Sequence, residues 1–372
     1  MAEERFSPGQ HIHLYTLEKR IDSGGMGEVW KARKTDQACV AIKFPHLQYS
    51  HDQRFRELVR REAAAQFNLH HPHIVAAEAV LEVDGLPAIV FYYVDGPNLE
   101  QEVYGPDKLI DQGTPLPLDR ALRIAAEILD ALDYAHQNCY VHRDVKSSNI
   151  LIEKTTDCAF LTDFGIVLNV AGPRLTRAGT VSGSVPYMSP EQITSPMTVN
   201  LRSDVYSFGV VLYEMITGAL PYRVEPGETT DPDFLIKEKH LKSDPAPPSS
   251  LNPVIPPELD RIVLRALEKQ PDRRFLGCGD FLRHIRELDS ARPSSGSARK
   301  TGPGTRVVIS DGLLKPPPAP APAQVPAYAG PPAEADREAF SQRFARWLPW
   351  LLFGVSGLIV AAAIALRFAA GK

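Results

Sequence analysis

The stretch Tyr140-Val-His-Arg-Asp-Val-Lys-Ser-Ser-Asn149, followed closely by Asp163-Phe-Gly165, decides how the rest of this chain is interpreted. It places a carboxylate (Asp144), an ammonium (Lys146) and an amide (Asn149) in one short polar loop between two apolar runs. The second motif begins with another carboxylate, at the end of the next predicted strand. Such a cluster suits phosphoryl transfer, in which catalysis rests on positioning and on stabilising charge. For Asp144 alone, a structural aspartate in a solvated turn is an equal alternative.

The complete string H-R-D-x-K-x-x-N followed by D-F-G is much more specific than any one of its residues. It resembles the catalytic core of the Ser/Thr protein kinases, in particular the bacterial, membrane-anchored group of eukaryotic (Hanks) type. The resemblance runs from about residue 15 to residue 288. It implies an α+β, bilobal protein kinase fold, with a β-rich N-lobe that carries helix C and a mainly helical C-lobe.

The chain has 372 residues and a net charge of −4, so it has no global basic field that would favour nucleic acid as a partner. The polar N-terminus lacks an apolar segment, and we expect no signal peptide. The 33 prolines gather late in the chain and indicate a linker there. The four cysteines lack the spacing of a zinc site or a disulfide framework, which fits a reducing cytosol: Cys39, Cys139, Cys158 and Cys278.

These features predict five segments along the chain. A short N-terminal tail (1–14) precedes the protein kinase domain (15–290), whose N-lobe ends at about residue 94. A Pro/Ala-rich juxtamembrane linker, expected to be disordered, covers 291–346. A transmembrane helix (347–366) and a short C-terminal tail (367–372) follow.

Residues 15–21 and 29–32 are typical of strands on either side of a glycine turn, Asp22-Ser-Gly-Gly-Met-Gly27. Glycines let backbone N–H groups approach triphosphate oxygens, although such a hairpin alone is often only a turn. Its position ahead of Val40-Ala-Ile-Lys43, an apolar strand that ends on a lysine, favours nucleotide binding. The resemblance assigns Lys43 to the α- and β-phosphates of ATP, and the cover over the nucleotide to Ile21, Gly24, Gly25, Gly27 and Val29.

A charged amphipathic helix is expected over residues 51–69. By the resemblance, Glu62 is the helix C glutamate that pairs with Lys43, and a solvated helix glutamate is the plainer alternative. Asp22 occupies the place of the family's first glycine, where its carboxylate is expected to weaken ATP binding without abolishing activity. Gln66 occupies a place where the family packs an apolar side chain, and is expected to loosen the active arrangement of the helix.

An apolar strand over residues 86–94 contains Tyr92-Tyr-Val94, which resembles the hinge that binds adenine through its backbone. The resemblance places Phe91 at the gate of the pocket behind adenine. It assigns the remaining adenine contacts to Val29, Ala41, Tyr92, Val94 and Leu151. Each of these is otherwise an ordinary core residue, and the two roles are compatible.

Apolar residues at helical spacing predict a helix over residues 118–137 that leads into the catalytic loop. By the resemblance, Asp144 orients the substrate hydroxyl and accepts its proton, and Lys146 neutralises charge on the transferring phosphoryl group. Asn149 and Asp163 would ligate Mg²⁺, with Mn²⁺ as an alternative, and ATP would be the phosphoryl donor. The lysine two residues after the aspartate is typical of Ser/Thr kinases, so the expected acceptors are Ser and Thr hydroxyls of protein substrates.

The loop after the D-F-G motif is expected to be an activation loop. In the family, an arginine at the place of Arg143 awaits a phosphate on this loop, because its planar fork binds phosphate bidentately. Thr176 and Thr180 are the leading phosphosites, although a polar loop is ordinarily rich in hydroxyls. Ser184 aligns with the residue that braces the catalytic Asp and Lys, so we exclude it as a switch.

Ser189-Pro-Glu191 closes this loop as a variant of the family's A-P-E motif, and Arg274 is expected to be the buried partner of Glu191. Asp204 precedes an apolar helix predicted over residues 205–217. In the family this aspartate anchors the backbone of the catalytic loop, and Asp204 is also a plausible helix-start residue. Further helices are predicted over residues 257–269 and 279–288.

Residues 347–366 form an uncharged apolar run that, at about 1.5 Å per helical residue, matches a hydrocarbon core about 30 Å thick. Arginines precede and follow it, and Trp347 and Trp350 suit the membrane interface. We expect one span in the cell (inner) membrane, with the kinase domain cytoplasmic and the C-terminus outside. A buried core helix is the alternative.

Small residues in the apolar run, Gly354, Ser356 and Gly357, favour helix pairing and hence a homodimer that autophosphorylates in trans. Thr301 and Thr305 in the linker are expected acceptors whose phosphates would recruit a phosphothreonine-reading domain.

The leading interpretation is a membrane-anchored Ser/Thr protein kinase activated by autophosphorylation of its activation loop. A pseudokinase scaffold is the alternative that Asp22 and Gln66 favour. The intact set of catalytic side chains weighs against it, because a scaffold has no need of all of them. A small-molecule kinase of related fold fits poorly, because Ser189-Pro-Glu191 and the hydroxyl-rich loop serve protein substrates.

Overall fold

The structure, a computed structural model, describes residues 5–24, 27–50, 52–105, 113–164, 184–224 and 231–291. Within the first long helix it does not describe the side chains at positions 54, 58, 61, 62, 64 and 65. The described residues all belong to one unit, Met1–Ser297. The predicted linker and membrane span therefore lie outside the described residues, apart from Ala291.

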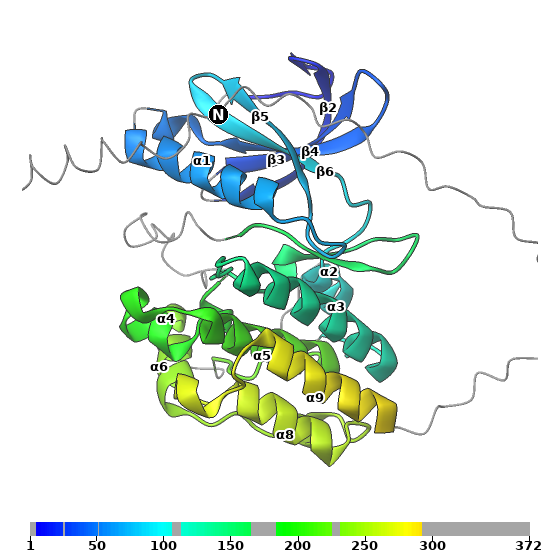
Figure 1. The fold of residues 1–372 in the computed structure, drawn as a ribbon, viewed down its shortest axis with the longest axis vertical. Coiled ribbons are helices and arrows are strands. Elements are labelled where there is room, and N and C mark those ends of the chain that lie inside the picture. The colour runs from blue at the N-terminus through cyan, green and yellow to red at the C-terminus, as the bar shows by residue number, and fades with distance from the viewer. Residues whose placement is uncertain are drawn as a thin grey trace, which may run out of the picture. The chain divides into compact units, whose positions relative to one another are not determined.

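The N-terminal part is an antiparallel sheet of six strands in the order β1-β2-β3-β4-β6-β5 (Figure 1). Its middle strands alternate between buried and partly exposed residues, as expected where each face meets a different environment. The strands are β1 (His11–Ile12), β2 (Tyr15–Gly24), β3 (Gly27–Lys34), β4 (Cys39–Pro45), β5 (Ala77–Val83) and β6 (Leu86–Tyr92).

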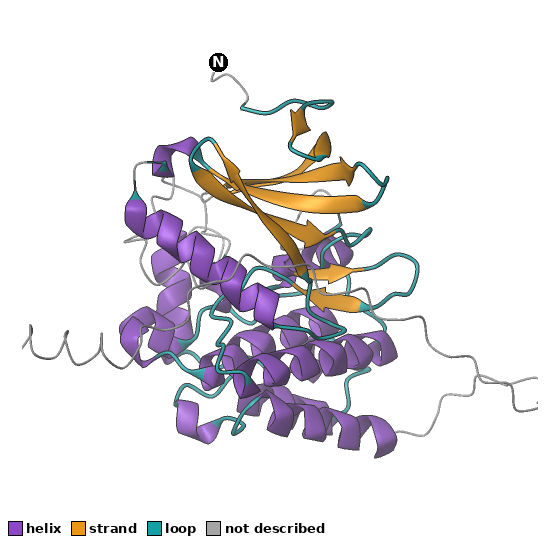
Figure 2. Cartoon of the chain, turned by 45° about the horizontal axis from the view of Figure 1, so that its top comes forward, coloured by secondary structure: helices purple, strands orange, loops and turns teal. Residues whose placement is uncertain are grey.

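Helix α1 (Gln53–Asn68) lies across one face of this sheet, as Figures 1 and 2 show. Its apolar residues Phe55, Val59 and Ala63 recur every four positions and pack with Ile89 and Phe91 of β6. This packing confirms that the N-lobe carries one long helix, and it fixes that helix against the strand that leads to the predicted hinge.

Residues of the N-terminal segment, from Arg5 onward, pack on the opposite face of the sheet. Phe6 is 3% exposed and packs on the rings of Trp30 and Phe44. Strand β1 then pairs with the start of β2. A lone aromatic residue in a polar stretch gives no periodic signal, so the sequence did not reveal this contact.

The C-terminal part is mainly helical and is organised around α5, nearly all of whose residues are buried. Helices α3 and α9 lie side by side against it, with α8 next to α5. A hairpin of β7 (Ile150–Ile152) and β8 (Ala159–Leu161) follows α3 and precedes α5 in the chain. The helices are α2 (Leu99–Tyr104), α3 (Leu118–Gln137), α4 (Pro190–Thr194), α5 (Leu201–Thr217), α6 (Pro232–Lys242), α7 (Pro248–Leu251), α8 (Pro257–Ala266) and α9 (Cys278–Ala291).

Short 3₁₀ turns connect several of these elements: η1 (Leu47–Tyr49), η2 (Ser147–Asn149), η4 (Val185–Tyr187), η5 (Pro196–Thr198) and η6 (Pro271–Arg273). Among the helices that the structure describes, none has the length and apolar character needed to cross a membrane.

Helix α5 begins earlier than the sequence indicated. Its N-cap is Asn200, whose side chain accepts a hydrogen bond from the backbone N–H of Arg202, and Ser203 completes a capping box. Asp204 therefore lies inside the first turn and is not the residue that starts the helix. Gly218 ends it in the left-handed conformation, with φ of 71°, which a residue without Cβ adopts at little cost.

Candidate active site

The catalytic loop lies between α3 and β7, and its polar side chains converge on Asp144. The ammonium of Lys146 donates to Oδ2 of Asp144 at 2.8 Å and to the hydroxyl of Ser184 at 3.0 Å. The amide of Asn149 donates to the carbonyl of Asp144 at 2.8 Å and to its Oδ2 at 3.2 Å. One aspartate, one lysine, one amide and one serine therefore hold each other in fixed positions. Ser184 contacts Lys146 as the resemblance implied, and its exclusion as a phosphorylation switch stays a prediction.

Asp204 of α5 anchors the backbone of the catalytic loop through hydrogen bonds. Its carboxylate accepts the backbone N–H groups of His142 and Arg143, each at 2.8 Å, and contacts Nε2 of His136 at 2.7 Å. These bonds fix Arg143 with φ of 67°, a left-handed conformation that non-glycine residues seldom adopt. Burial alone would raise the pKa of Asp204. The hydrogen bonds and charge of the facing groups outweigh this effect, so the net pKa is lowered and the carboxylate stays ionised.

Lys43 and Asp163, which lie 120 positions apart in the chain, meet at 2.7 Å between the sheet and the helical part. Burial raises the pKa of Asp163, and the ammonium of Lys43 more than offsets this, so the net pKa is lowered. Phe164, the next residue, is buried and its ring lies 4.6 Å from that of His142. Glu62 lies in α1, and its side chain is outside the described ones, so its predicted pairing with Lys43 stays a prediction.

Four of the six residues predicted to enclose adenine gather in one cluster. Phe91 and Val94 are buried there, and the partly buried Ala41 and Leu151 pack against them. Tyr92 is 44% exposed and its backbone N–H donates to the carbonyl of Ala76. The sheet and the β7–β8 hairpin thus bring together residues from three separate stretches of the chain.

The glycine turn closes the hairpin between β2 and β3, where Gly24 pairs with Gly27. A Cβ on Gly27 would lie 2.1 Å from the carbonyl oxygen of Phe44, so this position has room only for glycine. Ile21 is exposed and Val29 is partly buried on the same hairpin. Gly25 lies outside the described residues, so its predicted nucleotide contact stays a prediction.

Asn149, which bonds Asp144, and Asp163, which bonds Lys43, supply an amide oxygen and a carboxylate. Mg²⁺ is commonly held by one or two carboxylates completed by substrate phosphates, so this donor set fits it. In the described ranges, no cluster of three or more His, Cys, Asp or Glu side chains forms a separate metal site.

Glu191 and Arg274 form the expected buried pair. The two guanidinium nitrogens of Arg274 donate to the two carboxylate oxygens of Glu191 at 2.8 and 2.9 Å. Burial alone would raise the pKa of Glu191, but the hydrogen bonds and charge of Arg274 outweigh this effect, so the net pKa is lowered. The pair ties α4 to the segment before α9.

Two further residues support the site and were not predicted. The amide of Gln192 donates to the carbonyl of Arg143 at 2.8 Å, just beyond the Ser189-Pro-Glu191 motif. Glu214 of α5 accepts hydrogen bonds from Ser147 in the catalytic loop and from Tyr187, the latter at 2.8 Å. Its place ten residues after Asp204, in an otherwise apolar helix, was the only sequence signal.

Thr176 and Thr180 lie outside the described residues.

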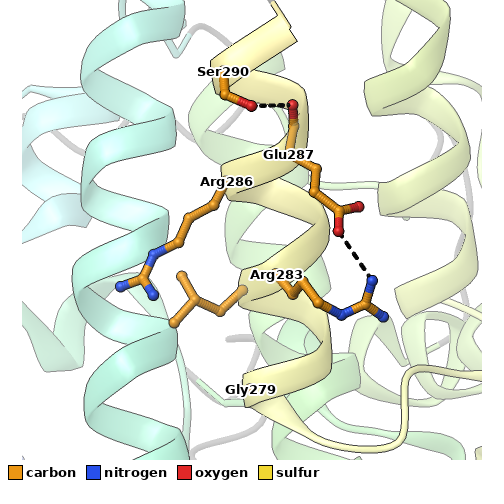
Figure 3. A pocket seen from close by; sticks show the side chains of 6 residues that line it. Gly279, Arg283, Arg286, Glu287 and Ser290 are labelled. Atoms are coloured by element: carbon orange, nitrogen blue, oxygen red, sulfur yellow. Dashed lines mark hydrogen bonds and ion pairs between the residues drawn. The ribbon is translucent and has the colours of Figure 1, made fainter.

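A shallow pocket of about 330 Å³ on α9 contains none of the predicted site residues (Figure 3). Its polar groups pair along the helix: Arg283 donates to Glu287 at 3.1 Å and the hydroxyl of Ser290 to the carbonyl of Glu287 at 2.9 Å. It therefore has the character of an ordinary helix surface.

Comparison with known proteins agrees with this arrangement. Residues 15–285 match the protein kinase domain family. The chain belongs to the protein kinase family. The matched region ends at residue 285, within α9, the last described helix of the fold.

Among curated relatives of this kinase-family chain is the Ser/Thr-protein kinase PknH of Mycobacterium bovis, 34% identical over 324 residues, covering 85% of this chain and 52% of PknH. The Ser/Thr-protein kinase PknD of Mycobacterium tuberculosis is 38% identical over 276 residues, covering 73% of this chain and 39% of PknD. The chain thus spans about half or less of the length of these relatives. They confirm the predicted resemblance to bacterial Ser/Thr protein kinases.

Among solved structures, the kinase domain of M. tuberculosis PknI is similar, with a TM-score of 0.57 and 27% identity. The match covers 77% of this chain and 99% of the PknI chain. This supports the bilobal fold across the region that carries the candidate active site.

Proposed function

We propose that this chain is a Ser/Thr protein kinase that transfers the γ-phosphoryl group of ATP to Ser or Thr hydroxyls of proteins. The observation that carries the proposal is the convergence of Lys146, Asn149 and Ser184 on Asp144, next to the Lys43–Asp163 pair. Phosphoryl transfer needs little covalent chemistry from the protein, and such a fixed charged constellation supplies the positioning that it does need.

In this proposal Asp144 faces the acceptor hydroxyl and accepts its proton. Lys146, already bonded to Asp144, lies where it neutralises charge on the transferring group. Asn149 and Asp163 would hold Mg²⁺, with Mn²⁺ as an alternative, and the ion would neutralise phosphate charge when bound. Lys43 would reach the α- and β-phosphates, with Glu62 orienting it. The glycine turn and the adenine cluster would enclose the rest of the nucleotide.

The regulatory part of the proposal concerns the loop after Asp163. Autophosphorylation of Thr176 or Thr180 would place a phosphate within reach of Arg143, whose backbone Asp204 and Gln192 already fix. A bound phosphate would order the loop through charge-assisted hydrogen bonds.

The proposal also covers the whole chain. A kinase domain of residues 15–290 would be tethered by the linker (291–346) to one membrane span (347–366), with the domain cytoplasmic and the residues after the span outside. The span would support a homodimer that autophosphorylates in trans. Phosphates on Thr301 or Thr305 would recruit a phosphothreonine-reading partner.

The comparisons, whose curated relatives are Ser/Thr protein kinases, do not favour the alternative of a pseudokinase scaffold. Two features of the sequence pointed to that alternative, and the structure shows their surroundings. Gln66 is 1% exposed, and among the described residues its carboxamide has no hydrogen-bond partner. An unsatisfied polar group in α1 disfavours this packing of the helix. Asp22, whose carboxylate accepts the backbone N–H of Ser23 at 2.8 Å, adds negative charge near the glycine turn.

The decisive experiment incubates the full-length chain with Mg-ATP, alone and with a generic basic protein, and maps phosphate by mass spectrometry. We expect phosphate on Thr176 or Thr180 and on the added protein. Asp144→Asn should lower the rate at least about 100-fold, because it removes the proton acceptor. Asp36→Asn, an exposed turn residue, serves as the matched control and should leave the rate unchanged. ATP binding without any transfer would establish the scaffold instead.

A further inference from the structure

The hairpin that carries the glycine turn is weakly anchored at the end of β2, next to that turn. All six residues of β2 from Lys19 to Gly24 are exposed, so none of them adds a side chain to the core. The pairing of β2 with β3 is also irregular between Arg20 and Asp22. Such an irregularity disrupts the hydrogen-bond ladder locally. The tip of β2 therefore depends on its hydrogen bonds for a fixed position.

One of these bonds comes from outside the hairpin. Nε2 of His46 lies 2.7 Å from the carbonyl oxygen of Gly24. A carbonyl oxygen only accepts, so the imidazole donates from Nε2–H. His46 directly follows β4, whose last residue, Pro45, is paired with Gly27. The end of β4 thus contacts both sides of the glycine turn.

The end of β4 is itself held by the N-terminal segment. Arg5 donates from Nη1 to the carbonyl of Pro45 at 2.5 Å and pairs with Asp84, in the turn between β5 and β6, at 3.0 Å. The guanidinium lies 4.6 Å from the ring centre of Phe6, which is buried against Trp30 and Phe44. Through Pro45 and His46, the N-terminal segment and the sheet core fix a point to which Gly24 is tied.

We propose that His46 is a positioning residue that holds the glycine turn through the carbonyl of Gly24 and so sets the affinity for the phosphates of the nucleotide. The inference rests on the proposed function, because that function makes the glycine turn the cover over the triphosphate. His46 does not touch the reacting atoms in this proposal. It acts by limiting the positions that the turn adopts before ATP binds, which reduces the ordering needed on binding.

Two substitutions separate the hydrogen bond from the size of the ring. His46→Phe keeps a ring but removes the N–H donor, whereas His46→Gln places an amide N–H near the position of Nε2. His70→Phe is the matched control, because His70 is exposed and lies after α1, outside the hairpin. Arg5→Met tests the support of Pro45 from the N-terminal side.

The first measurement is hydrogen–deuterium exchange of the full-length chain without nucleotide. We expect His46→Phe to speed exchange in peptides covering residues 22–28 by about 3- to 10-fold, the range expected for one lost hydrogen bond. His46→Gln should restore most of the protection, Arg5→Met should have a smaller effect, and His70→Phe none. Unchanged exchange in His46→Phe would overturn the proposal, whether or not the chain transfers phosphate.

The second measurement compares ligands that differ only in phosphate. His46→Phe should raise the Kd for ATP by about 3- to 10-fold and leave the Kd for adenosine unchanged, because adenosine does not reach the turn. If transfer is observed, the KM for ATP should rise in the same proportion with kcat nearly constant. An equal loss of ATP and adenosine affinity would mean a general structural role and would overturn the proposal. A chain that binds neither ligand refutes the proposed function, and the exchange measurement then decides on His46 alone.

Discussion

At the scale of single residues, Gln66 combines a polar side chain with an apolar position. It lies on the face of α1 that also carries Val59 and Ala63, both of which are buried. Leaving a buried carboxamide without a partner costs roughly 1–3 kcal/mol. The sequence alone indicated that this position is apolar in the family, and the structure adds that the carboxamide is enclosed.

We predict that Gln66→Leu raises the free energy of unfolding by about 1–3 kcal/mol, because it removes the unsatisfied group and fills a similar volume. Urea denaturation of the full-length chain would measure this. Gln137→Leu is the control, since Gln137 is exposed and its amide bonds Asp133, and it should change stability by less than about 0.5 kcal/mol. A Gln66→Leu chain no more stable than wild type would mean that the carboxamide is satisfied in solution. Faster phosphoryl transfer in this variant would further link the packing of α1 to activity.

Glu214 gives a pH-dependent prediction. Burial raises its pKa to about 7, although the hydroxyls of Ser147 and Tyr187 donate to it and lower the pKa in part. Its pKa in the unfolded chain is near the usual 4.5. Between these two values the folded protein keeps a proton that the unfolded chain releases. The stability that this proton provides is complete below about pH 4.5 and is lost as the pH rises through 7.

Glu214→Gln cannot ionise, so its stability relative to wild type should increase from pH 5 to pH 8. The increase should be of the order of 3 kcal/mol at most, from about 1.4 kcal/mol for each unit of pKa difference. Thermal unfolding of both chains across this range would measure it. The lowered pKa values of Asp204 and Glu191 change the stability only at lower pH, and they do so equally in both chains. A difference that does not vary with pH would show that Glu214 titrates normally.

At the scale of elements, the sequence predicted best where apolar periodicity is strong. The helix expected over residues 118–137 has the same bounds as α3, because the buried residues of α3 recur at helical spacing. The start of α5 was misplaced, because Leu201 and Arg202 carry little signal and the deciding cap is Asn200. Contacts such as His46 with Gly24 depend on the geometry of a turn and leave no pattern in the sequence. The same holds for the burial of Phe6.

The pair of Glu191 and Arg274 joins elements that are 83 positions apart in the chain. Arg274 also donates to the backbone carbonyls of Arg202, Glu268 and Lys269. Its side chain is fully buried. Through Glu191 and the neighbouring Gln192, which bonds the carbonyl of Arg143, this junction supports the catalytic loop.

We predict that Arg274→Met lowers the free energy of unfolding by about 3–5 kcal/mol, because it leaves the carboxylate of Glu191 buried without its charged partner. The double variant Arg274→Met with Glu191→Met should recover part of this loss. Urea denaturation of the two single variants and the double variant forms a complete cycle. Strictly additive losses would mean that the two side chains act independently, contrary to their bidentate geometry.

At the scale of the whole molecule, the sequence predicts a part of the chain that lies outside the described residues. The run from Trp347 to Leu366 has no charged residue and is long enough for one span. A charged residue at the centre of such a span costs about 2.5–3.5 kcal/mol by insertion scales. Two charges there should therefore oppose insertion strongly, whereas charges in the linker should not.

We predict that the full-length chain sediments with membranes, resists extraction by high salt and is released by detergent. Ile359→Arg combined with Ala362→Arg should move most of it to the soluble fraction. Ala319→Arg combined with Ala321→Arg adds the same charge to the linker and should leave it membrane-bound, since arginine there meets only water or anionic headgroups. Wild-type chain in the soluble fraction would refute the span. Release of both variants by salt alone would mean that the attachment is electrostatic, with the apolar run buried elsewhere.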